Sequence, residues 1–294
     1  MWTLRSPTVR AGLRSLACGL VLSAAGSAAG YQDGRIEGWT PSSPSAPGSV
    51  AQTGEADADA DADGGRAELR LPDLRTRPPT DMYVVDARSE GGPVRLKFTT
   101  LIWNAGDGPL EVRGDPDEAD GGREVEQHAV DADGRWHAVG PVGRFDVEHR
   151  HGHLHLSGFA DYELWTLPGD LSDPGDPTAR PDGPGELIAE NVKIGFCLMD
   201  NVVVDEAMAA DGAAYTSCEA EVQGISPGYG DLYVAELYEQ DIDITDVPDG
   251  RYRLVNVANP DGVLRESDAA NNVGFTDVEL RTDADGRRVV ASQR

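Results

Sequence analysis

The chain has 294 residues and is strongly acidic, with 52 Asp and Glu residues against 25 Lys and Arg residues and a formal net charge of −27. A surface of this sign repels nucleic-acid phosphates, which excludes nucleic acid as a partner, and attracts cations such as protonated amines. Solubility or adaptation to salt is the favoured explanation of the acidity, so the charge alone names no substrate. No stretch approaches the roughly 20 apolar residues needed to cross a bilayer, so we expect no membrane span.

Residues 1–30 have the layout of a secretory signal peptide. Three arginines precede an apolar run from Leu16 to about Ala25, and small residues follow. We expect cleavage near Ala29 or Gly30, which makes the mature protein secreted or part of the cell envelope. Loss of the three arginines takes the net charge from −27 to −30.

Three cysteines are present. Cys18 lies inside the apolar run, but Ser15 stands where a lipoprotein signal has leucine, so a lipid anchor at Cys18 is not favoured. Cys197 and Cys218 then remain as an even pair in an oxidising compartment. They predict one disulfide that closes a loop of about 20 residues and is worth about 3 kcal/mol. Two buried free thiols are the less natural alternative outside the cytoplasm.

Residues 31–67 are expected to be a disordered acidic linker. The stretch PSSPSAPGS is rich in Pro and Ser, and GEADADADADGG is a low-complexity repeat with nothing to bury. The sequence thus predicts a signal peptide over 1–30, a linker over 31–67 and a single folded domain over 68–294.

From residue 94 onward the apolar pattern has a period of two, as in a strand with one face in a core. Val94, Leu96 and Phe98 alternate with polar residues, and the turn signals AGDG, PDGPG, PDG and NPDG separate further strand-like runs. Those runs are GPLEVRG, ADYELWTL, RYRLVNVAN and FTDVELR. We therefore expect a mostly β fold, a single β-sandwich or irregular barrel with long loops. Short helices are expected only at 202–210 and 232–238, and 171–186 is expected to be an exposed excursion.

Four of the six histidines stand on alternate positions of EHRHGHLHLSGF, at His149, His151, His153 and His155. Residues two apart in a strand share a face, so neighbouring imidazoles of an H-x-H pair can tilt onto one ion. Four such residues span roughly 20 Å, too far for all to bind one ion at about 2 Å, so we expect three ligands and one bystander. Copper or zinc with an open coordination position is favoured, and the alternative is an incidental polar face.

Lys193, in ENVKIGFCLMD, is one of only two lysines; the other, Lys97, falls on the polar face of a predicted strand. Lys193 lies among apolar residues four positions before Cys197. Apolar surroundings favour the neutral amine, which is nucleophilic, although a surface lysine with its amine in water also fits this position.

A tyrosine-containing loop, QGISPGYGDLYVAELYEQDIDITDVPDGRY, supplies Tyr229, Tyr233 and Tyr238. Together with FCLMD, ESDAANNV and the histidine strand followed by FADYEL, it resembles the lysyl oxidase family of secreted copper amine oxidases. LPDLRTRPP and WNAGDGPLEVRG resemble the start of its bacterial members. The similarity covers about residues 71–280.

The resemblance implies a copper(II) site at His151, His153 and His155, with His149 as a rim residue. It also implies a lysine tyrosylquinone cofactor built from Lys193 and Tyr233. Animal members carry five disulfides, whereas only the Cys197–Cys218 pair can form in this mature chain, and Tyr229 stands where the family has a half-cystine.

The implied activity is oxidative deamination of primary amines to aldehydes, with O2 as acceptor and release of ammonia and hydrogen peroxide. The amines would be lysine side chains of proteins or small polyamines. A carboxylate must accept the α proton, and Asp231 and Asp200 are the candidates nearest in sequence. Two alternatives stay open: a secreted copper-binding β module without oxidase activity, and a zinc hydrolase that uses the three histidines and a bound water.

Overall fold

The computed structural model describes residues 68–114, 123–147, 153–167, 185–191 and 195–293. The expected signal peptide and linker, most of the expected excursion at 171–186, and His149, His151 and Lys193 lie outside these residues.

The fold is mostly β, as the alternating pattern predicts. In the described part of the chain the only helical element is a short 3-10 helix, η1 (Arg88–Glu90). No helix found there is long and apolar enough to cross a membrane. The strands are β1 (Leu69–Arg70), β2 (Leu74–Thr76), β3 (Thr80–Asp86), β4 (Val94–Asn104), β5 (Leu110–Gly114), β6 (Arg123–Asp131), β7 (Trp136–Val147), β8 (Leu154–Leu156), β9 (Ala160–Thr166), β10 (Leu187–Asn191), β11 (Val202–Val203), β12 (Val222–Ile225), β13 (Tyr229–Tyr233), β14 (Asp241–Asp243), β15 (Gly250–Ala258), β16 (Val273–Thr282) and β17 (Arg288–Gln293).

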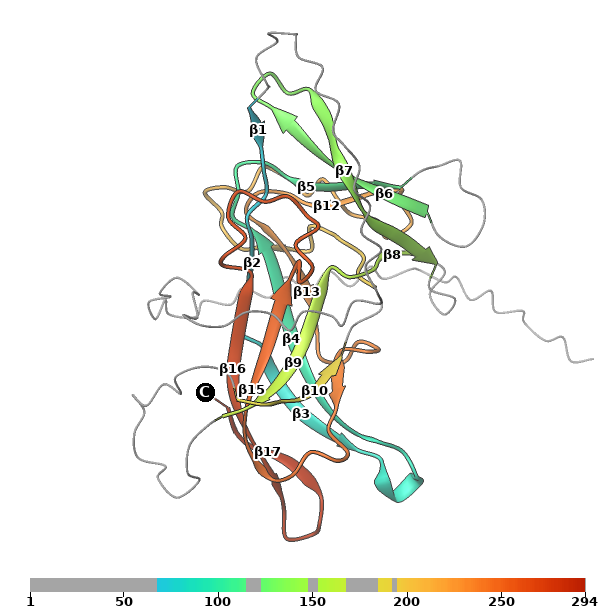
Figure 1. Ribbon diagram of the computed structural model, residues 1–294, viewed down its shortest axis with the longest axis vertical. Helices are drawn as coiled ribbons and strands as arrows, with labels where there is room; N and C mark the ends of the chain where they lie inside the picture. Colours follow the sequence, from blue (N-terminus) through green and yellow to red (C-terminus); the bar gives the residue numbers. More distant parts are fainter. Residues whose placement is uncertain (1–67, 115–122, 148–152, 168–184, 192–194, 294) are drawn as a thin grey trace, which may run out of the picture. The chain divides into compact units, whose positions relative to one another are not determined.

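Within the described ranges the strands form three antiparallel sheets. The first has the order β12-β5-β6-β7-β8, with β1 paired to β6, and the second has the order β10-β9-β15-β16-β17. The third has the order β11-β13-β4-β14, with β2 and β3 also paired to β4. Figure 1 shows β9, β15 and β16 side by side in the second sheet.

The hydrophobic core includes residues of all three sheets, and part of it lies where the second and third sheets meet. Leu96 and Phe98 of β4 are fully buried, and the Phe98 ring meets the edge of Tyr162 from β9 at a centroid distance of 5.0 Å. The Tyr162 hydroxyl lies 3.1 Å from Thr100 Oγ1 and donates to Gln240 Oε1 at 3.1 Å, and Gln240 donates back to Thr100 at 3.0 Å. This closed ring satisfies three buried polar side chains and joins the two sheets.

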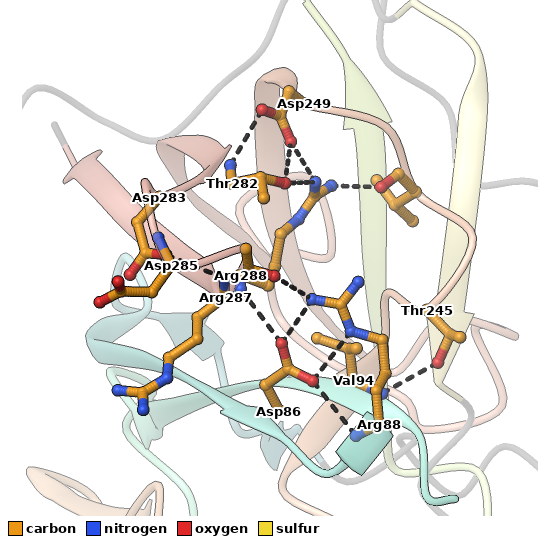
Figure 2. A network of polar contacts seen from close by, with 12 residues as sticks. Asp86, Arg88, Val94, Thr245, Asp249, Thr282, Asp283, Asp285, Arg287 and Arg288 are labelled. Carbon is orange, nitrogen blue, oxygen red and sulfur yellow. Dashed lines mark hydrogen bonds and ion pairs between the residues drawn. The ribbon is translucent and has the colours of Figure 1, made fainter.

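A polar network ties the β16–β17 hairpin to β3 (Figure 2). The Asp86 carboxylate accepts hydrogen bonds from the Arg288 backbone N–H at 3.1 Å and from the Arg88 guanidinium at 2.6 Å. Arg88 also donates to the carbonyl of Gly286 at 2.9 Å. The Arg288 side chain is almost fully buried and pairs with Asp249. These bonds hold the last strand against the rest of the domain.

The two expected short helices are wrong. Val202 and Val203 form β11, which pairs with β13, and the following residues turn around Asp205, whose side chain accepts the N–H of Ala207 at 2.9 Å. Leu232 belongs to β13, and beyond it the chain turns at Leu237. The β-branched valines favour a strand, and pairing with a neighbouring strand outweighs weak local helical periodicity.

Candidate metal and tyrosine site

The side chains of His153 and His155 converge beside β8. Leu154 and Leu156 turn into the core, whereas the two histidines are half-buried on the opposite face. Their Nε2 atoms lie 2.8 Å apart and their ring centroids 4.6 Å apart. This is the paired arrangement predicted for H-x-H in a strand. Two nitrogens about 2.0 Å from one ion at a right angle have about this separation, so the pair fits adjacent positions of one metal.

The third expected ligand, His151, lies outside the described residues. Within the described ranges no group of three or more His, Cys, Asp or Glu side chains could hold a metal. His151 and His149 lie outside those ranges, so the structure brings together two of the four histidines of the tract and does not describe the other two.

Backbone hydrogen bonds attach β8 to the segment that follows Lys193. Leu156 and Phe196 exchange N–H···O bonds of 2.8 and 2.9 Å, which form an isolated antiparallel bridge. A Cβ atom on Gly195 would lie 2.3 Å from Cβ of His155, so only glycine fits against that histidine. The segment after Lys193 therefore packs directly on a metal-ligand candidate.

The same segment contacts Tyr233 on its other side. The fully buried Phe196 ring meets the edge of the Tyr233 ring at a centroid distance of 5.1 Å. The Tyr233 hydroxyl lies 2.9 Å from the carbonyl oxygen of Cys197. Residues 195–197 thus lie between His155 and Tyr233, and the distant parts of the sequence meet in one place.

Asp231 is the nearest described carboxylate to the Tyr233 hydroxyl. Both residues are on β13 and face inward, with 1% and 8% of their surfaces exposed. The phenol donates to Asp231 Oδ2 at 2.7 Å, and Asn201 Nδ2 donates to Asp231 Oδ1 at 2.8 Å. Burial, and then the Asp231 charge, raise the pKa of Tyr233 well above its ordinary value, so the phenol is protonated at neutral pH.

The side chain of Asp200, the other candidate base, binds the loops that surround it. Its carboxylate accepts hydrogen bonds from the backbone of Ala214 at 2.8 Å, the backbone of Ser226 at 2.7 Å and the Ser226 hydroxyl at 2.7 Å. A carboxylate that binds this many donors holds the loop around it. The geometry therefore separates two aspartates that sequence proximity could not.

The predicted disulfide between Cys197 and Cys218 is confirmed, with the Cα atoms 5.3 Å apart. Cys218 also accepts the backbone N–H of Leu154 at 3.0 Å through its carbonyl. Because Cys197 binds the Tyr233 hydroxyl, the disulfide joins the backbone that supports the tyrosine to the backbone that supports the histidines.

Three further residues considered in the sequence, Tyr229, Tyr238 and Lys97, have the following positions. Tyr229 is buried and donates to the carbonyl of Ala210 at 2.9 Å, while Tyr238 is half exposed. Lys97 is bound to Asp241 at 3.1 Å and to the carbonyl of Leu237 at 2.7 Å.

Gly195 and Phe196 contact the site and were missed in the sequence. The signal in the sequence that could have identified them is a glycine followed by an aromatic residue between Lys193 and Cys197.

The chain is similar to proteins described as lysyl oxidases. Residues 182–290 match the family model described as lysyl oxidase. Over 93 residues the chain is 40% identical to protein-lysine 6-oxidase of Gallus gallus, covering 31% of this chain and 20% of that protein. It is 34% identical over 141 residues to lysyl oxidase homolog 2 of Gallus gallus, covering 48% and 15%. With lysyl oxidase homolog 1 of Homo sapiens it shares 39% identity over 89 residues, covering 30% and 15%.

The predicted resemblance to the lysyl oxidase family is therefore confirmed. The region matched by the family model includes both disulfide cysteines, Lys193, Asp231 and Tyr233, and the histidine tract precedes it. The chain spans at most a fifth of the length of these three relatives.

Proposed function

We propose that the chain is a copper-dependent amine oxidase of the protein-lysine 6-oxidase type, which converts primary amines to aldehydes with release of ammonia and hydrogen peroxide. The observation that carries the proposal is the position of residues 195–197, which contact His155 on one side and Tyr233 on the other. Lys193 stands two residues before this segment in the sequence, and in the proposal it joins Tyr233 beside the metal site.

The donor set fits copper(II). The Nε2 atoms of His153 and His155 are 2.8 Å apart, and imidazole is a ligand that suits copper. In the proposal His151 is the third ligand, and Lys193 with Tyr233 forms the lysine tyrosylquinone. When present, copper and the quinone would supply an acceptor that takes two electrons from the amine, as its α C–H bond is broken, and delivers them to O2.

The residues of the chain position the ring and move the proton. The Cys197 carbonyl and the Asp231 carboxylate both lie within 3 Å of the Tyr233 oxygen and fix the ring within the buried face of the sheet. Asp231 is the proposed acceptor of the α proton of the substrate, because its Oδ2 is 2.7 Å from the ring oxygen. Exclusion of water from this face strengthens the interactions of the carboxylate.

The proposed substrates are cationic primary amines, either lysine side chains of proteins or small polyamines. The net charge of −27 supports this class, because an acidic surface raises the local concentration of protonated amines. In the same proposal residues 68–294 form the catalytic domain, and the mature protein is secreted or held in the cell envelope after cleavage near Ala29.

The test uses copper-loaded protein exposed to air. Wild type is expected to develop a quinone absorbance and to release hydrogen peroxide from a primary amine. Tyr233→Phe is expected to abolish both, while the matched variant at a half-exposed tyrosine, Tyr238→Phe, keeps both.

Three outcomes would contradict the proposal. Full copper occupancy without colour or peroxide would favour the copper-binding module. Hydrolytic activity restored by zinc and not by copper would favour the hydrolase. Peroxide release by Tyr233→Phe at the wild-type rate would exclude Tyr233 as the cofactor precursor.

A further inference from the structure

Gln223, in β12, connects the histidine strand to the segment that supports Tyr233. Its side chain is 1% exposed. Nε2 donates to the carbonyl of Leu154 at 3.0 Å and, more weakly, to the carbonyl of Cys218 at 3.4 Å. Oε1 accepts the backbone N–H of Leu198 at 3.1 Å. One buried amide therefore binds three stretches of main chain.

The bonded groups adjoin the residues of the proposed site. The Leu154 carbonyl belongs to the peptide bond that leads into His155, and the Leu154 N–H, bound to Cys218, belongs to the peptide bond that follows His153. Because a peptide unit is planar, fixing these groups fixes the backbone directions from which both imidazoles project.

The other end of the amide reaches the tyrosine side of the site. Leu198 directly follows Cys197, whose carbonyl is 2.9 Å from the Tyr233 hydroxyl. The side-chain amide of Gln223 is a rigid planar group with two donors on its nitrogen and an acceptor at its oxygen. It therefore sets the spacing between the backbone that carries the two histidines and the backbone that contacts Tyr233.

We infer that Gln223 is a positioning residue for the metal site, which holds the Leu154 peptide so that the His153 and His155 rings converge. This inference rests on the proposed function, because it takes copper as the ion that the histidines bind. Glutamine suits the role because it supplies two N–H donors and one acceptor at this distance. Glutamate lacks the donors, and methionine lacks both donors and acceptor.

Copper affinity and the spectrum of the bound ion test this role without using enzymatic activity. In Gln223→Met the dissociation constant for copper(II), measured by competition with a chelator, is expected to rise about tenfold, as for other changes beyond the ligands themselves. The electron paramagnetic resonance spectrum of the copper-loaded variant is expected to differ from that of wild type. Gln223→Glu, which keeps the shape and the acceptor, is expected to show the same two changes because the donors to Leu154 and Cys218 are lost.

Gln127 provides a matched control. It is fully buried on β6, where its side chain accepts from the N–H of Arg265 at 2.7 Å and donates to the carbonyl of Arg265 at 2.9 Å. Gln127→Met therefore removes a comparable buried amide and is expected to lower thermal stability. Its copper affinity and spectrum are expected to equal those of wild type.

The outcomes separate the inference from the function on which it rests. Wild-type affinity and spectrum in both Gln223 variants would overturn the positioning role and leave the oxidase proposal standing. Equal losses in Gln127→Met would also overturn it, because the effect would then be a general loss of stability. A wild-type chain that does not bind copper would overturn both.

Discussion

The hydroxyl of Tyr233 donates a hydrogen bond to Oδ2 of Asp231 at 2.7 Å, and both side chains project from β13 onto the buried face of the third sheet. Residues at i and i+2 of a strand share a face, so the pairing follows from the D-L-Y order in the sequence. This relationship gives the proposed cofactor tyrosine a carboxylate within proton-transfer distance.

Asp231→Asn is expected to lower kcat for a primary amine by at least about 100-fold, because asparagine keeps the shape of the side chain but cannot accept a proton as a carboxylate does. Copper affinity is expected to stay at the wild-type value. Steady-state peroxide release, together with chelator competition, measures both quantities.

Asp200→Asn serves as the contrasting variant. It removes a carboxylate that binds the backbone of Ala214 and both donors of Ser226, so the free energy of unfolding is expected to fall by about 2 kcal/mol. The kcat of the folded fraction is expected to remain near wild type. A variant at Asp231 with normal kcat, beside one at Asp200 with almost none, would reverse the assignment of the base.

His155→Asn is expected to raise the copper dissociation constant by at least about 100-fold, because the loss of a direct ligand exceeds the 10-fold to 100-fold loss caused by outer residues. His149→Asn is expected to change it little. His137→Asn is the surface control, since His137 is bound to Asp131 at 2.8 Å on another part of the first sheet. Equal losses at His149 and His155 would show that the ligand set is assigned wrongly.

Gly195→Ala tests the close approach between the histidine strand and residues 195–197. The added methyl would lie 2.3 Å from Cβ of His155, so the two segments must move apart. Copper affinity and quinone formation are both expected to fall. The same substitution at Gly134, where a Cβ meets nothing within 4 Å, strains only a turn with φ of 78°. The Gly195 contact has no role in the site if Gly195→Ala retains wild-type copper affinity and colour.

Replacement of Asp161 by a neutral residue is expected to stabilise the folded protein in a pH-dependent way. Burial, and then the neighbouring Asp261, Glu163 and Glu190, raise the pKa of Asp161 to about 6. The folded state therefore favours the protonated carboxyl over the carboxylate. The stability that the protonated form gives the folded state is lost as the pH rises through 6 and the carboxyl ionises. Asp161→Asn is expected to raise the free energy of unfolding by about 1 kcal/mol at about pH 8, after allowance for solvent screening, and by nothing at about pH 3.

Chemical denaturation at both pH values checks this expectation. Asp107→Asn, in an exposed turn, is the control and is expected to show no such gain. A variant at Asp161 that is no more stable than wild type at the higher pH would contradict the prediction.

The period-two pattern predicted the β fold because alternation is a local property. Leu96 and Phe98 are buried while Lys97 between them is not fully buried, as the sequence indicates. The H-x-H spacing predicted the convergence of His153 and His155 for the same reason, and the lone pair of mature cysteines predicted the disulfide.

Contacts between distant segments could not be predicted in this way. The position of Phe196 between the histidine strand and Tyr233 depends on the bridge to Leu156 and on sheet pairing. The different roles of Asp200 and Asp231 depend on which donors surround each carboxylate, and sequence distance does not contain that information. The prediction of two short helices was wrong because β11 and β13 pair with other strands.

The most direct measurement is the mass of proteolytic peptides from copper-loaded protein kept in air. The central claim is that His155, Lys193 and Tyr233 form one site, and it predicts a covalently joined species that contains the Lys193 and Tyr233 peptides. This species is expected to be absent from Tyr233→Phe and present in Tyr238→Phe. Recovery of the two peptides separately and unmodified from fully copper-loaded wild type would contradict the claim.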